Sequence, residues 1–160
     1  MRLIELLTQE RVAIQPKAAE SNRALEKSEA LRLLARMLVA GARVDAADVE
    51  RVLSEREQLQ STGIGEGVAI PHGALSQLQT QYAALLIVPG GVEFDAIDGM
   101  KVNILFAVIG PKRATGEHLK TLARVSRLLR NKGFRDQLVA APDAAAAYAL
   151  IVAEEGGERR

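Results

Sequence analysis

The sequence predicts an α/β fold in which one mixed β-sheet is sandwiched between α-helices within a single domain. The chain has 160 residues, a usual length for one hydrophobic core. Its apolar residues first follow a helical period, then form short runs separated by glycine and proline, and then return to a helical period. With 48% apolar and 26% charged residues, the composition excludes the disordered and fibrous classes.

Two amphipathic helices are expected before the sheet. The first covers residues 22–40, with Ser21 as its N-cap and Gly41 as its stop. Its apolar stripe consists of Leu25, Leu31, Leu34, Met37 and Leu38. The second helix begins after Asp45 and ends near Glu57.

The middle of the chain predicts strands, because short apolar runs alternate there with glycine and proline. These runs are Val68–Ile70, Ala83–Val88, Val92–Phe94 and Val102–Ile109. The second and fourth are almost continuously apolar, which is typical of central strands covered on both faces. We expect a further edge strand at Arg11–Ile14.

Helices are expected again after the sheet. The helical period returns from Thr115 to Lys132, and Gly133 is expected to end that helix. A short helix follows at Phe134–Ala140, and Pro142 is suited to be the first residue of a final helix over residues 143–154.

We therefore expect one domain over residues 1–154, followed by a solvated tail at 155–160. The first 20 residues lack the apolar core of a signal peptide, and no run approaches the 18 apolar residues of a membrane span. Both observations favour a cytoplasmic protein that is not itself a membrane protein.

The composition excludes several kinds of site. The absence of cysteine removes disulfides, thiolate zinc sites, iron–sulfur clusters and cysteine nucleophiles. The two histidines, His72 and His118, do not have the spacing of a helical zinc motif, so we expect no metal and no cofactor. A net charge of +1 and only five aromatic residues argue against a nucleic-acid partner.

The most informative stretch is Ser61–Gly73, in which four glycines and a proline surround His72. It fits neither the dinucleotide fingerprint nor the P-loop. A tight loop that exposes backbone N–H groups beside an imidazole suits a phosphoryl group. The alternative is a simple turn followed by a surface histidine.

This stretch, S-T-G-I-G-x-G-x-A-I-P-H-G, resembles the active-site motif of the enzyme IIA domains of the phosphoenolpyruvate:sugar phosphotransferase system, in their fructose/mannitol and nitrogen-regulatory class. The segments Phe94-Asp-Ala-Ile-Asp-Gly and Glu117-His-Leu-Lys-x-Leu resemble the same family, and the likeness extends from Leu6 to Ala153. It implies that His72 accepts a phosphoryl group from a phosphohistidine on a small HPr-type carrier, and that the protein relays phosphate rather than hydrolysing it.

The resemblance also implies two residues that support the phosphate. His118 lies in the first turn of its helix and on the inward stripe, where a satisfied core histidine is the alternative. The helix N-terminus would lower its pKa and favour a neutral donor to phosphoryl oxygens. Arg56 lies on the apolar stripe of the second helix, either as a snorkelling side chain near the helix C-terminus or as a donor to phosphate.

Other polar residues are weaker candidates. Ser61, Thr62 and Gly63 lie close enough in sequence to contact the same phosphate, although serine or threonine before glycine is typical of turns. Asp95 and Asp98 suggest a hairpin turn rather than a pair of catalytic carboxylates.

A basic run in the last third of the chain predicts either a solvated face or a contact with an acidic partner protein. The run consists of Lys112, Arg113, Lys120, Arg124, Arg127, Arg130, Lys132 and Arg135. Within it, Lys120, Arg124 and Arg127 are expected on the outer face of their helix.

The family has two branches that differ in the fate of the phosphate. Because this chain has neither a cysteine nor a membrane span, any onward acceptor must be another polypeptide. The beginning Leu3-Ile-Glu-Leu-Leu and the Phe94 segment look most like the nitrogen-regulatory branch, which implies phosphorylation-dependent binding to an unidentified target protein. The alternative is a sugar-transport enzyme IIA that passes phosphate to a separate IIB–IIC permease. A third hypothesis is an anion-binding module that is never phosphorylated.

Overall fold

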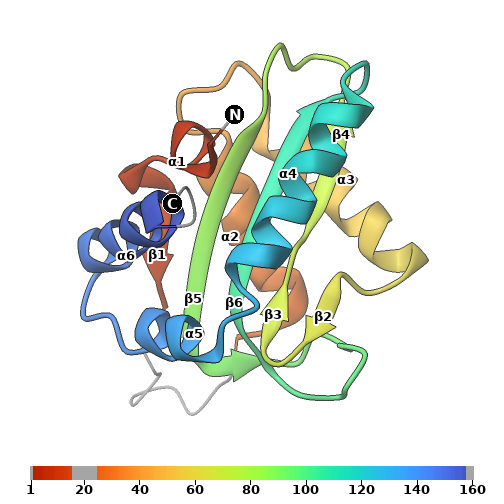
Figure 1. Ribbon diagram of the computed structural model, residues 1–160. Helices are drawn as coiled ribbons and strands as arrows, with labels where there is room; N and C mark the ends of the chain where they lie inside the picture. The colour runs from red at the N-terminus through yellow and green to blue at the C-terminus, as the bar shows by residue number, and fades with distance from the viewer. Residues whose placement is uncertain (1, 16–24, 158–160) are drawn as a thin grey trace.

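The computed structural model describes residues 2–15 and 25–157. It shows a single α/β domain with a six-stranded mixed sheet between helices, as the sequence predicts (Figure 1). The helices are α1 (Leu3–Leu6), α2 (Lys27–Leu38), α3 (Ala46–Leu59), α4 (Thr115–Leu128), α5 (Lys132–Val139) and α6 (Ala144–Gly157), with a 3-10 turn at Gln9–Arg11. The strands are β1 (Val12–Ile14), β2 (Gly63–Gly65), β3 (Val68–Ala69), β4 (His72–Leu75), β5 (Tyr82–Val92) and β6 (Val102–Pro111).

The two long apolar strands form the centre of the sheet. The strand order is β1-β5-β6-β3-β2, and β4 also pairs with β6. Strands β5 and β6 are antiparallel, whereas β1, β3 and β4 run parallel to their central neighbours. The expected edge strand near residue 12 is therefore confirmed as β1.

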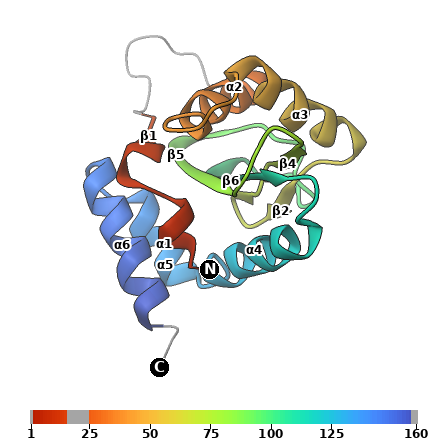
Figure 2. The same cartoon turned by 90° about the horizontal axis from the view of Figure 1, so that it is seen from above.

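Helices cover both faces of this sheet, as the view from above shows (Figure 2). Helices α2 and α3 bury Leu34 and Leu53 against one face. On the other face α4, α5 and α6 bury Val125, Phe134 and Ile151. Among the described residues, no helix is both long enough and apolar enough to cross a membrane.

The glycine-rich regions of the sheet differ from the prediction. Strand β5 contains the run expected at Ala83–Val88 and ends at Val92, so the separate strand expected at Val92–Phe94 is wrong: only Val92 is in a strand, and Glu93 and Phe94 lie beyond it. The pairing of β5 with β6 is irregular between Ile87 and Val92. Gly91, with φ +81°, lies within this irregularity. Strands β2 and β4 are not anticipated by the sequence, because their glycines interrupt the apolar alternation that identifies a strand.

The ends of helices α2 and α4 also differ from the prediction. Helix α2 begins at Lys27 instead of residue 22, because Glu26 forms a capping box with Glu29, and the expected N-cap Ser21 lies outside the described residues. Helix α4 ends at Leu128 instead of Lys132, and Gly133 lies inside α5 rather than stopping α4. The cause is a new N-cap, since Asn131 Oδ1 accepts from the Phe134 N–H at 3.0 Å.

The predicted tail is wrong at its first three residues, because α6 continues to Gly157. Glu155 is fully buried and accepts hydrogen bonds from the backbone N–H groups of Leu3 at 2.7 Å and Ile4 at 3.0 Å. These donors belong to α1, a four-residue helix that the sequence analysis does not predict. The remaining tail residues, 158–160, lie outside the described residues.

Candidate functional site

His72 is the first residue of β4 and lies half-buried in register with Val108 of β6. Its Nδ1 lies 2.8 Å from the carbonyl oxygen of Ile70. Because a carbonyl oxygen only accepts, Nδ1 carries the hydrogen and Nε2 retains a free lone pair. The loop before the strand thus fixes which ring nitrogen is able to act as a nucleophile.

The pKa of His72 lies below its ordinary value of 6.5, mainly because burial disfavours the charged ring. The hydrogen bond to Ile70 opposes this decrease, the charge of Arg56 adds to it, and the charge of Glu57 opposes it. At neutral pH the ring is therefore uncharged, which is the form that has a nucleophilic nitrogen.

His118, in the first turn of α4, lies beside His72. The two ring centroids are 5.7 Å apart and the ring planes are inclined by 51°. The pKa of His118 is also lowered, first by burial and then by the neighbouring His72. The structure thus brings the two predicted histidines together as a pair of half-buried neutral rings.

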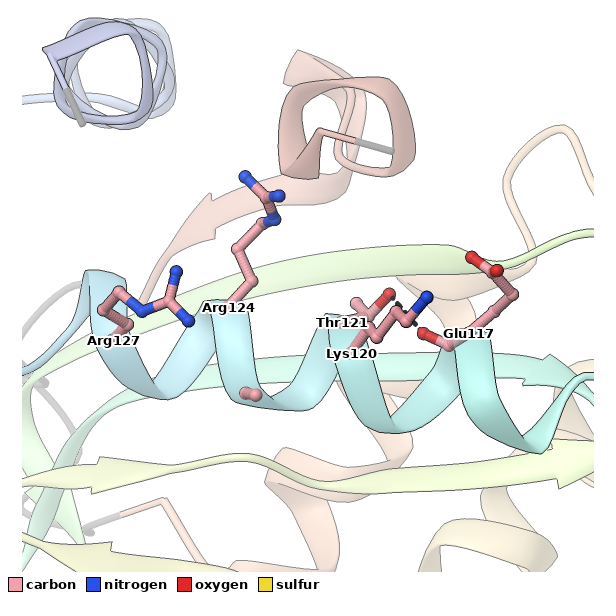
Figure 3. A pocket seen from close by; sticks show the side chains of 6 residues that line it. Glu117, Lys120, Thr121, Arg124 and Arg127 are labelled. Atoms are coloured by element: carbon pink, nitrogen blue, oxygen red, sulfur yellow. Dashed lines mark hydrogen bonds between the residues drawn. The ribbon is translucent and has the colours of Figure 1, made fainter. Parts of the chain in front are cut away.

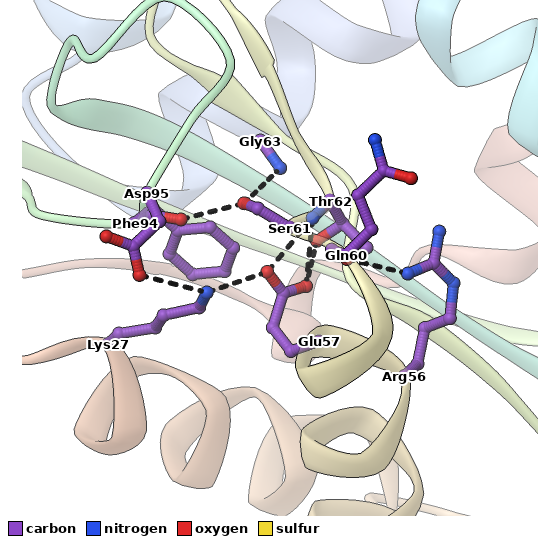
Figure 4. Close-up of polar contacts among 9 residues, drawn as sticks. All are labelled: Lys27, Arg56, Glu57, Gln60, Ser61, Thr62, Gly63, Phe94 and Asp95. Carbon is purple, nitrogen blue, oxygen red and sulfur yellow. Dashed lines mark hydrogen bonds and ion pairs between the residues drawn. The ribbon is translucent and has the colours of Figure 1, made fainter.

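Arg56 lies in the last turn of α3 and extends toward the end of that helix. Its Nη1 donates to the carbonyl oxygen of Gln60, the C-cap residue, at 2.7 Å (Figure 4). This bond agrees with the helix-end interpretation, while the effect of its charge on the pKa of His72 agrees with a place at the site. Arg56 therefore binds the end of α3, and its charge lowers the pKa of His72.

The residues suggested as phosphate contacts have partners within the protein. Ser61 Oγ donates to the Phe94 carbonyl at 2.7 Å and accepts from the Gly63 N–H at 3.0 Å. The Thr62 N–H lies 2.9 Å from Glu57 Oε1, and the Thr62 hydroxyl donates to the same carboxylate. The bond between Ser61 and Gly63 is the turn chemistry that the sequence left as the alternative. The bonds of Thr62 connect the loop that precedes His72 to α3.

Glu57 is a site residue that the sequence analysis overlooked. Its carboxylate is 4% exposed and lies 2.9 Å from the Lys27 ammonium. That ammonium also lies 4.6 Å from the centre of the Phe94 ring and 3.8 Å from Asp95 (Figure 4). The spacing of Glu57 in the sequence could have revealed its burial. Glu57 follows Leu53 by one helical turn, so it lies on the buried stripe of α3.

Asp95 and Asp98 do not form a carboxylate pair. Asp98 accepts from the N–H groups of Glu66 at 2.8 Å and Met100 at 3.1 Å. These two bonds lower the pKa of Asp98, while Asp95 faces Lys27. The interpretation as a turn therefore agrees with the contacts.

The members of the basic run differ in their surroundings, since several line the surface of α4 and Arg135 is buried. Lys120, Arg124 and Arg127 project from one side of α4, where they line a hollow of about 240 Å³ together with Glu117, Thr121 and Ala123 (Figure 3). In contrast, Arg135 is buried and donates to the carbonyl oxygens of Leu129 at 3.0 Å and Arg130 at 2.7 Å.

No metal centre is formed by the described part of the chain, where groups of three or more candidate ligand side chains are lacking. The chemistry available at the site is that of a neutral imidazole nitrogen next to a second imidazole and a guanidinium. Such a set suits the transfer of an anionic group to nitrogen.

The chain is similar to known proteins over nearly its whole length. Residues 5–154 match the family model described as "Phosphoenolpyruvate-dependent sugar phosphotransferase system, EIIA 2". The chain is 37% identical over 158 residues to a nitrogen regulatory protein of Pseudomonas aeruginosa, with 99% of both chains covered. It is 30% identical over 141 residues to the fructose-specific EIIABC component of Bacillus subtilis, but that match covers only 21% of the longer protein.

A solved structure of a nitrogen regulatory protein is also similar to this chain. The crystal structure of nitrogen regulatory protein IIA-Ntr from Neisseria meningitidis superposes with a TM-score of 0.81 at 30% identity, over 92% of this chain and 97% of that one. The family model spans nearly the whole chain, and the likeness suggested by the I-P-H-G motif is confirmed. This chain belongs to the EIIA 2 family of the phosphoenolpyruvate-dependent sugar phosphotransferase system.

Proposed function

We propose that this protein is a phosphocarrier of the nitrogen-regulatory type, in which Nε2 of His72 accepts a phosphoryl group from a phosphohistidine on an HPr-type carrier. The observation that carries the proposal is the hydrogen bond from Nδ1 to the Ile70 carbonyl, which leaves Nε2 free on a neutral ring. This atom has the lone pair that an in-line displacement at phosphorus requires.

The transfer exchanges one nitrogen–phosphorus bond for another. The lone pair of Nε2 attacks phosphorus, and the bond to the carrier's histidine breaks with its electron pair returning to that nitrogen. The His72 ring becomes positively charged as the new bond forms. The Ile70 carbonyl stabilises this charge, because it already accepts the Nδ1 hydrogen.

Arg56 and His118 support the phosphoryl oxygens in this proposal. A guanidinium has five N–H donors, so the bond from Arg56 to Gln60 leaves others for phosphate. His118, with its ring 5.7 Å from that of His72, lies near enough to donate to a group attached there. Ser61, Thr62 and Gly63 contribute by holding the loop that presents His72.

The regulatory role rests on the similarity to nitrogen regulatory proteins along almost the full chain. A phosphoryl group adds about −1.5 to −2 charge at neutral pH, beside the positive charge of Arg56. Such a change of charge on a protein surface alters which partners bind, so the two phosphorylation states are able to select different target proteins.

Sugar transport is the second candidate function, since the chain also resembles a fructose-specific component. In that case the phosphoryl group passes from His72 to a separate IIB domain. The two candidates share the chemistry at His72 and differ only in the acceptor.

The test is incubation with phosphoenolpyruvate, enzyme I and an HPr-type carrier. We expect acid-labile phosphate on the wild-type protein, slower labelling of His118→Ala, and no labelling of His72→Ala. Labelling of His72→Ala at His118 would contradict the assignment. Adding a purified fructose-type IIB domain to the phosphorylated protein distinguishes between the two candidate functions. Rapid transfer of the label to IIB supports sugar transport, whereas retention of the label supports regulation.

A further inference from the structure

Two buried polar atoms without partners lie near the second histidine. His118 Nδ1 and Gln81 Oε1 are both inaccessible to solvent, and within the described ranges neither has a hydrogen-bond partner. The Gln81 residue is only 6% exposed. Buried polar groups are usually paired, so two unpaired atoms that border one space are candidates to pair with each other.

The two side chains border the same space above Gly110 of β6. A Cβ placed on Gly110 would lie 3.0 Å from Gln81 Cγ and 3.4 Å from His118 Nδ1. Gln81 directly precedes β5, whose first residue, Tyr82, pairs with Ile109 next to Gly110. Because Gly110 has no side chain, no Cβ fills the space that the Gln81 side chain and the His118 ring border.

The chemistry of the two atoms determines which hydrogen bond they form. An amide oxygen only accepts, whereas an imidazole nitrogen donates when it carries a hydrogen. The pair is therefore complementary only if Nδ1 of His118 carries the hydrogen. The terminal torsion of a glutamine side chain is soft, so the amide is free to turn its oxygen toward the ring.

We propose that Gln81 is a positioning residue for His118, whose Nδ1–H donates to Gln81 Oε1. This bond selects one neutral tautomer and leaves Nε2 as the ring nitrogen that carries a lone pair. The titratable group that acts on this ring is His72 on β4. The other residues that border it at Gly110 are neutral, since the segment before β5 contributes Gln81 and β6 contributes Gly110 itself.

One consequence rests on the proposed phosphocarrier function. In this tautomer Nε2 donates to a phosphoryl oxygen only after it takes up a proton from solvent. Phosphorylation of His72 and protonation of His118 are then coupled, since the charged ring has an acceptor at each nitrogen: Gln81 at Nδ1 and the phosphoryl group at Nε2. The sequence-based expectation of a neutral donor at His118 is replaced by a charged one.

The experiment is nitrogen-15 NMR of the imidazole rings in the unphosphorylated protein. We expect the Nδ1–H tautomer of His118 in the wild type and in Gln81→Glu, which keeps an acceptor oxygen. Gln81→Met, of similar size but without the acceptor, is expected to change His118 to the Nε2–H tautomer. Gln77→Met, at an exposed position, serves as the matched control and should match the wild type.

The proposal is overturned if the wild type has the Nε2–H tautomer, or if Gln81→Met leaves the tautomer unchanged while its amide spectrum shows a folded protein. If Gln81→Met fails to fold, two other measurements still test the proposal. They are the tautomer of His118 in the wild type and the increase in the pKa of His118 that is expected in Gln81→Glu. Titration after phosphorylation should show a higher pKa of His118 than before, with a smaller increase in Gln81→Met. If the protein accepts no phosphate, the proposed function fails, whereas the tautomer result still tests the Gln81 contact.

Discussion

A Cβ placed on Gly73 would lie 2.3 Å from Cγ1 of Val52, so that α3 and β4 approach as closely as a glycine permits. Gly73 directly follows His72, and Val52 precedes Arg56 by one helical turn. The contact between these two residues therefore sets the distance between the helix that carries Arg56 and the strand that carries His72.

Gly73→Ala is expected to lower the free energy of unfolding by about 1–3 kcal/mol, the usual cost of overpacking, and to slow phosphoryl acceptance by displacing α3. Urea denaturation and labelling rates measure the two effects. Gly116→Ala is the control, because a Cβ there meets nothing within 4 Å. Val52→Ala should lessen the effect of Gly73→Ala, and a double-mutant cycle without such coupling would show that the contact is not the cause.

Arg56→Gln is expected to raise the pKa of His72, because the positive charge that lowers it is removed. It should also slow phosphoryl acceptance by roughly ten- to a hundredfold, which corresponds to the loss of a charged hydrogen bond of about 1.5–3 kcal/mol. Histidine titration by NMR and labelling rates provide the measurements. Arg51→Gln, an exposed arginine on the same helix, should leave both quantities near their wild-type values. If the pKa of His72 is unchanged in Arg56→Gln, the guanidinium of Arg56 does not act on His72.

The stability of the protein should fall as the pH is lowered below about 6.5, the pKa of an unperturbed histidine. Both histidine pKa values are lower in the folded protein, so the unfolded chain binds more protons over this range. The contribution of the neutral rings is complete above the unfolded pKa and is lost as the pH falls toward the folded values. Urea denaturation at several pH values should show this slope, and the double variant His72→Gln, His118→Gln should show a smaller one.

Glu57→Ala is expected to lower the free energy of unfolding by about 3–5 kcal/mol, because it removes the nearer carboxylate from the Lys27 ammonium and the shared acceptor from the N–H and hydroxyl groups of Thr62. Thermal or urea denaturation measures the loss. Glu55→Ala provides the comparison, since that side chain is 62% exposed and its removal should change stability by less than about 0.5 kcal/mol. Equal stability of the two variants would contradict a buried role for Glu57.

The parts of the fold that the sequence predicts are those with a strong local pattern. Strands β5 and β6 are covered on both faces, and this requirement produces apolar runs that are easily recognised. Helices α3 and α4 begin where the sequence predicts because their apolar stripes are regular. His72 and His118 are identified by the two sequence motifs that contain them, and the family resemblance implies that they lie close together.

The parts that the sequence does not predict depend on partners far along the chain. Strand β4 contains a glycine and has no apolar alternation, yet it is stabilised by pairing with β6. Glu57 is a carboxylate whose burial depends on Lys27, thirty positions earlier. The Gln81 side chain, likewise, comes close to His118 only because both residues border Gly110 of β6.

The buried carboxylate of Glu155 joins segments from opposite ends of the described chain, since it binds the N–H groups of Leu3 and Ile4 and lies 3.8 Å from the Arg124 guanidinium. A four-residue helix has little stability of its own, so α1 depends on this contact and on the burial of Leu3 and Leu6. We therefore expect the first residues and the last helix to open as one cooperative unit. Amide hydrogen exchange at Leu3 and Ile4 should follow the exchange of α6 rather than that of the neighbouring residues in sequence.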